Sequence, residues 1–191
     1  IVLVVLVVLV LAVGGWIRGM YNGLVASDEG VKAGWAQVEN QLQRRYDLIP
    51  NLVETVKGYA AHERETLQAV TDARSRVGGA GTVDEKIEAN QQLSGALSRL
   101  LLVVERYPDL KANQNFVRLQ DELAGTENRI AVERRRYNEL VQGYNTQVRS
   151  FTTSIFAGMF GFDRATLFES VEGAQTAPRV SFGNEAGSTG G

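Results

Sequence analysis

The first seventeen residues, Ile1 to Ile17, read IVLVVLVVLVLAVGGWI and contain no charged side chain. With a rise of about 1.5 Å per residue, a helix of this length measures roughly 26 Å, close to the thickness of a bilayer's hydrocarbon core. The run therefore predicts a transmembrane anchor over residues 1–17. The small residues at 12–14 also resemble a signal-peptide cleavage site, so a removable leader is the alternative.

Basic residues near the anchor predict which side of the membrane carries the remainder of the chain. Arg18 follows the apolar run directly, and Lys32, Arg44 and Arg45 come later. Because positively charged flanks tend to stay on the cytoplasmic side, this pattern favours a cytoplasmic C-terminal part.

Composition bounds the fold and excludes some functions. A net charge of −2 gives no excess positive charge for nucleic acid, so we expect no such partner. Without cysteine, the chain forms neither disulfides nor thiolate metal sites. Residues 31–149 are rich in helix-favouring Ala, Leu, Glu, Gln and Arg, and nothing outside the anchor alternates with period two. The sequence predicts an all-α protein with an N-terminal transmembrane helix followed by an antiparallel bundle of three to four long helices.

A juxtamembrane segment at residues 18–30 is expected to lead into a helical bundle at residues 31–151. The first long helix is predicted to reach residue 77, because apolar residues recur along it at steps of three, four or seven. Pro50 lies in the middle and either kinks this helix or divides it. We favour a kink because the seven-residue spacing continues through the proline; a division would give four helices.

Turn and capping residues predict the remaining helix ends. The glycine-rich run at 78–81 is a stop, and Thr82 with Glu85 matches a capping box that starts the second helix. This helix is expected to end near Arg106, and the third to start near Asp109.

The third predicted helix has the most regular pattern in the chain. Large apolar residues repeat every seven positions from Phe116 to Phe151, as in a coiled coil. A neighbouring seam is polar at Gln120, Glu127 and Arg134. These three residues predict a hydrogen-bonded layer that sets the register of the bundle; the alternative is that they face water.

Residues 152–172 are expected to form an apolar segment and a short helix starting at Asp163, and residues 173–191 a flexible tail. With three long helices, this segment would lie at the tip of the rod farthest from the membrane. There it would pack against neighbouring subunits or a distal apolar surface, or else cover its own bundle as a lid. Its large apolar residues are Phe151, Ile155, Phe156, Met159, Phe160 and Phe162.

Three glycines near the end of the anchor, Gly15, Gly19 and Gly23, occur at four-residue spacing. On one helix they form a stripe that lets a second backbone approach closely. The stripe predicts self-association beside the bilayer. A flexible joint is the alternative, because glycine weakens a helix.

Several unusual strings resemble those of the LemA family of bacterial membrane proteins. They are YNGLV at 21–25, QLQRRYDLIPNLVETVKGY at 41–59, YPDLKAN at 107–113 and TENRIA at 126–131, and the resemblance covers roughly residues 1–170. It implies an anchor in a bacterial cell membrane and a bundle described for the family as four-helical. Members are linked to envelope maintenance, membrane proteases and, in one branch, magnetosome membranes. The resemblance implies no settled activity and no catalytic residues.

Few groups in the chain could support catalysis. His62 is the only histidine, and the residues after it lack the second histidine of a zinc-protease motif. The glycine-rich run at 78–81 lacks the lysine of a phosphate-binding loop. We therefore expect no enzyme, no metal and no cofactor. The basic clusters at 44–45 and 134–136 are expected to be solvated and paired with glutamates, because consecutive helix residues point about 100° apart. Contact with anionic lipid or an acidic partner is the alternative.

Together these features favour a membrane-anchored, self-associating helical scaffold that organises the bacterial envelope or membrane. The alternative is a regulatory adaptor that binds a membrane protease or an envelope sensor through the bundle. The expected partners are membrane lipid and further copies of the chain, with a membrane-protein partner in the second case.

Overall fold

The computed structural model describes residues 1–168, in which helices are joined by short connections and no strand occurs. This confirms the predicted all-α fold with a long apolar N-terminal helix. The helices are α1 (Val2–Tyr59), α2 (Arg64–Gly79), α3 (Val83–Val104), α4 (Pro108–Lys111), α5 (Gln114–Arg149) and α6 (Phe151–Phe160).

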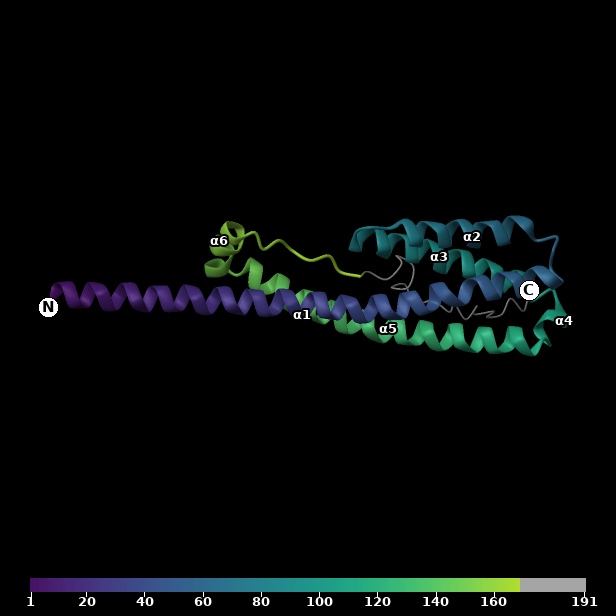
Figure 1. Cartoon of the computed structure of the whole chain (residues 1–191), viewed down its shortest axis with the longest axis horizontal. Helices are drawn as coiled ribbons and strands as arrows, with labels where there is room; N and C mark the ends of the chain where they lie inside the picture. The colour runs from purple at the N-terminus through teal and green to yellow at the C-terminus, as the bar shows by residue number, and fades with distance from the viewer. Residues whose placement is uncertain (169–191) are drawn as a thin grey trace, which may run out of the picture.

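Helix α1 has two parts with different surroundings. Its 58 residues correspond to about 87 Å, and its N-terminal part extends beyond the other helices (Figure 1). The large apolar side chains of residues 1–13 are all at least 46% exposed. Within the described chain, α1 is the one helix long and apolar enough to cross a membrane. From Leu24 to Val56, by contrast, residues at steps of three, four and seven are buried in the bundle.

The other long helices pack along the second part of α1. Helix α5 runs antiparallel to α1, so that Ser27 Oγ donates to Gln147 Oε1 at 2.8 Å, and α2 and α3 form a hairpin beside the distal half of α1 (Figure 1). The predicted capping box starts α3: the Glu85 amide donates to Thr82 Oγ1 at 3.2 Å, and the Glu85 carboxylate accepts from the Thr82 amide at 3.1 Å.

Helix α1 continues through Pro50, as favoured from the sequence. Proline lacks the N–H that would donate to the carbonyl of Tyr46, four residues earlier. Arg74 of α2 compensates, because its Nε donates to that carbonyl at 3.4 Å and its guanidinium lies 3.9 Å from the centre of the Tyr46 ring. The neighbouring helix therefore satisfies the carbonyl that proline leaves open.

The prediction that the first helix reaches residue 77 is wrong, because the chain reverses at residues 60–63 and forms four long helices. Contacts from a distant segment hold this reversal. The carboxylate of Glu63 accepts from Tyr107 Oη and from Arg106 Nη2, both at 2.9 Å, and Tyr59 Oη accepts from Asn113 Nδ2 at 2.8 Å. The side chain of Asn113 also accepts from the Phe116 amide, so α5 begins one turn later than the predicted start near Asp109.

The predicted short helix starting at Asp163 is also wrong for the residues described, since 162–168 form no helix. Two asparagines of α5 explain the difference. Asn145 donates to the carbonyl and accepts from the amide of Ala165, each at 2.9 Å, and Asn138 pairs in the same way with Phe168, at 3.0 and 2.8 Å. The side-chain amides thus replace the backbone partners that a helix would supply. The remainder of that predicted helix and the tail at 173–191 lie outside the described residues.

Candidate functional site

Aromatic contacts join α6 to the end of the apolar part of α1. The ring of Phe156 lies 6.2 Å from that of Trp16, and Tyr21 lies 5.0 Å from Phe160 and 5.8 Å from Phe162, all edge to face. Figure 1 shows α6 beside the N-terminal half of the molecule, far from α4. Helix α6, Phe162 just after it, and the part of α1 from Trp16 to Tyr21 therefore form one aromatic cluster.

This placement corrects the expectation that the apolar segment lies at the tip far from the membrane. The reversal at residues 60–63 adds one more change of direction to the chain. As a result α5 runs back toward the N-terminal end of α1 and carries α6 with it.

The large side chains of α6 divide into two groups. Phe156 is half-buried against Trp16, Phe160 is 44% exposed beside Tyr21, and the small side chain of Ala157 is buried. Phe151, Ile155 and Met159 are 86%, 65% and 69% exposed and recur every four residues, so they lie on one side of the helix. Whether this segment contacts other subunits or acts as a lid stays a prediction.

The glycine stripe lies on an open side of α1. A Cβ atom built at Gly15, Gly19 or Gly23 would meet no atom within 4 Å. Neither α5 nor α6 therefore covers the stripe, and a second helix could approach it. Self-association through these glycines stays a prediction.

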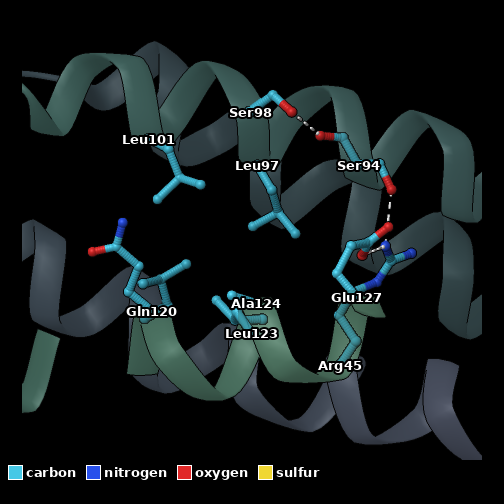
Figure 2. A pocket seen from close by; sticks show the side chains of 10 residues that line it. Arg45, Ser94, Leu97, Ser98, Leu101, Gln120, Leu123, Ala124 and Glu127 are labelled. Atoms are coloured by element: carbon cyan, nitrogen blue, oxygen red, sulfur yellow. Dashed lines mark hydrogen bonds and ion pairs between the residues drawn. The ribbon is translucent and has the colours of Figure 1, made fainter. Parts of the chain in front are cut away.

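A cleft of about 310 Å³ lies between α3 and α5, with α1 beneath it. Its walls are mainly apolar: Leu97 and Leu101 of α3 face Leu123 and Ala124 of α5 (Figure 2). Polar residues occupy its ends, with Gln120 at one and Arg45, Ser94 and Glu127 at the other.

The side chain of Arg45 is only 3% exposed, which makes it a buried charge. Its Nη1 donates to Ser94 Oγ at 2.8 Å and to Glu127 Oε2 at 2.9 Å. Its Nη2 donates to the Asn90 side-chain oxygen at 2.7 Å and to the Asn90 carbonyl at 3.2 Å. The Nε is buried without a hydrogen-bond partner in residues 1–168. Four hydrogen bonds, one to a carboxylate, offset the desolvation of the guanidinium.

The expectation that Arg45 is solvated is therefore wrong, although its predicted pairing with a glutamate occurs. The signal was present in the sequence. Arg45 lies three residues after Leu42 and four before Ile49, on the same stripe as the buried apolar residues of α1. Asn90 carried the same kind of signal, because it lies three residues after Ile87 and three before Leu93 on the buried stripe of α3.

The three residues of the predicted polar layer have different neighbours along α5. Gln120 is exposed at one end of the cleft, and Glu127 pairs with Arg45 at the other. The guanidinium of Arg134 lies 5.7 Å from the centre of the Phe168 ring. That the three together set the register of the bundle stays a prediction.

No catalytic arrangement is evident in the described part of the chain. Within residues 1–168, no group of three or more His, Asp or Glu side chains is placed to hold a metal ion. His62 is exposed in the reversal between α1 and α2. The buried Tyr137 has a raised pKa because burial disfavours its charged form, and its hydroxyl donates to the Thr166 carbonyl at 2.8 Å, which is a structural role.

The model of the LemA family matches residues 34–182, which is most of the chain. The chain belongs to the LemA family. Magnetosome protein MamQ 2 of Paramagnetospirillum magneticum is 28% identical over 175 residues, covering 78% of this LemA chain and 64% of that protein. Magnetosome protein MamQ of Magnetospirillum gryphiswaldense is 27% identical over 174 residues, with the same coverage. Protein LemA of Metamycoplasma hominis is 24% identical over 156 residues, covering 81% of this chain and 71% of that one.

This LemA chain thus spans 64% of the length of the magnetosome relatives. The family and the apolar α1 together identify a membrane-associated helical protein.

Proposed function

We propose that this LemA-family protein is a membrane-anchored, self-associating scaffold that organises a bacterial membrane. The observation that carries the proposal is the continuity of α1. One helix is exposed and apolar at its N-terminal end and forms the core of the bundle along its remaining length. Because no loop separates the two parts, the bundle keeps a fixed direction relative to the anchor. Residues 18–59 place its far end about 63 Å beyond the apolar run.

Self-association is supported by the open glycine stripe on the same helix. In lipid, helices associate through close packing of small residues, since water does not drive them together. A scaffold also agrees with the described residues, whose polar groups are arranged for packing and capping and not for turnover of a substrate. Two relatives carry the name magnetosome protein, which supports an organising role at a membrane. We place the bundle on the cytoplasmic side, because Arg18 follows the apolar run.

The experiment that tests the proposal is the mass of the full chain in mild detergent, measured by light scattering after size exclusion. We expect a homo-oligomer. Gly19→Ile should reduce the mass to that of a single chain, because a branched side chain would hold the helices apart. Gly14→Ile is the matched control, since Gly14 lies in the same helix, off the stripe, and is equally open. A monomeric wild-type chain, or equal masses for both variants, would contradict the proposal.

The cleft between α3 and α5 favours a second candidate, the regulatory adaptor. Its apolar walls and the exposed carboxylate of Glu127 at one end would suit a segment of a partner that carries both apolar and basic side chains. A chain that is monomeric in detergent, and that loses a co-purified membrane protein when Leu101→Arg closes the cleft, would favour the adaptor over the scaffold.

A further inference from the structure

We propose that α6 is a second membrane contact: it lies at the boundary between hydrocarbon and headgroups, beside the anchor, with Phe151, Ile155 and Met159 in lipid. These three residues are called the lipid face below. The proposal rests on the membrane attachment of α1 and does not require self-association.

The depth of α6 follows from its contacts with α1. Trp16 belongs to the uncharged run, and its ring contacts Phe156 of α6. Tyr21, four residues or about 6 Å beyond the end of that run, contacts Phe160. A bilayer that covers Ile1 to Ile17 must therefore reach the level of α6. Trp and Tyr are also the residues most enriched at this boundary.

The lipid face continues an apolar surface that the anchor already presents. Trp16 and Val13 are exposed on α1. Phe156 of α6 packs against Trp16 and so connects this end of α1 to the lipid face. Three large apolar side chains exposed at regular spacing form a contiguous patch, unlike the isolated exposed Leu102 of α3. Such patches usually mark an interaction surface. Here the lipid that surrounds the anchor lies next to the patch.

Charge supports the same placement. Helix α6 carries no charged side chain between Phe151 and Phe160. Exposed arginines occur at its two flanks, Arg149 before it and Arg164 after it, and Arg18 follows the anchor at the same level; the one acidic residue at these flanks is the exposed Asp163. Basic residues around an apolar helix match anionic headgroups around a hydrocarbon surface.

Labelling single cysteines in the full chain tests the proposal, because the native sequence has none. Ile155→Cys would carry the environment-sensitive dye NBD, and the chain would be reconstituted in vesicles of phosphatidylcholine and phosphatidylglycerol. We expect a blue-shifted emission whose intensity falls when the lipids carry brominated acyl chains. Leu102→Cys is the matched control, since Leu102 is 72% exposed but lies on α3. Its emission should be that of a dye in water and insensitive to bromine.

Two outcomes would overturn the proposal. A blue shift without bromine quenching would show that a second copy of the protein covers the lipid face, and a water-like emission would show that nothing covers it. Met159→Cys repeats the measurement on the same side of α6, and circular dichroism checks that each variant keeps its helices. A label at Leu9→Cys reports on the anchor: if it escapes quenching, α1 is not inserted, and both this inference and the proposed function fail. If it is quenched and the α6 labels are not, this inference alone fails.

Discussion

Replacing the partners of Arg45 one at a time should show that a buried amide, more than the paired carboxylate, stabilises this charge. Asn90 is 3% exposed and accepts from the guanidinium at 2.7 Å. The side chain of Glu127 is 58% exposed and accepts at 2.9 Å. Water can replace Glu127 far more readily than it can replace Asn90.

The magnitudes follow from this difference in burial. A hydrogen bond to a charged group contributes about 1.5 to 3 kcal/mol, so Asn90→Ala should lower the free energy of unfolding by about 2 kcal/mol. The Asn90 carbonyl remains as a partner at 3.2 Å, which limits the loss. Ion pairs with an exposed partner contribute about 0.2 to 1 kcal/mol, so Glu127→Ala should cost less than about 1 kcal/mol, and less still at high salt.

Urea unfolding of the full chain in mild detergent, followed by circular dichroism at 222 nm, measures both costs. Asp121→Ala is the matched control, because it removes an exposed carboxylate from the same helix and reports the effect of alanine on helix stability. The reasoning fails if Glu127→Ala costs as much as Asn90→Ala, or if its cost does not fall as salt is added.

Four further predictions concern α2 and α3. Arg74→Met should lower the free energy of unfolding by about 1 to 2 kcal/mol, because it removes a weak hydrogen bond and a cation–π contact. Arg74→Met should lower the free energy of unfolding by less in a Pro50→Ala variant, because alanine restores the missing amide. Equal decreases of the urea midpoint in the native chain and in the Pro50→Ala variant would contradict this. Thr82→Ala should lower the free energy of urea unfolding by about 1 kcal/mol by removing a helix cap. Because backbone amides lower the pKa of the Glu85 carboxyl from 4.5, its contribution to stability is present above that value and lost as the pH falls through the lowered one. The native chain should therefore lose more thermal stability on acidification than Glu85→Gln does. Gly95→Ala should raise the free energy of unfolding by about 0.5 to 1 kcal/mol, since a Cβ there meets no atom within 4 Å; an unchanged or lower midpoint would count against it.

Local patterns predicted the parts of this fold that depend on neighbouring residues. The stripe from Val31 to Val56, the stop at 78–81 and the capping box at Thr82 all reflect interactions within one or two helical turns. The same stripe contained Arg45, so its burial was predictable from spacing. Because charged residues usually lie on the surface, the charge of Arg45 indicated an exposed position, whereas the residue is buried.

Features fixed by distant residues were not predictable in this way. The reversal at residues 60–63 depends on Arg106 and Tyr107, more than forty positions away. A weak local signal existed, because no large apolar residue occurs between Tyr59 and Leu67. The irregular course of residues 162–168 depends on asparagines of α5, and polar residues on an exposed helix give no sign of what they bind.

The direction of the chain separates the two candidate functions in space. In the proposed arrangement, α1 leaves the membrane and α5 runs back toward it, so Gly19 would lie beside the bilayer and the cleft farther out. Arg45 is 27 residues beyond Arg18, which corresponds to about 40 Å along α1. A partner confined to the bilayer cannot reach that distance, so an adaptor must bind a segment that projects from the membrane. Self-association through the glycines, in contrast, needs contact only at the membrane. Substitution at Gly19 should therefore affect only the scaffold and substitution at Leu101 only the adaptor. A variant at either position that disrupted both would show that assembly is needed to form the cleft's binding surface.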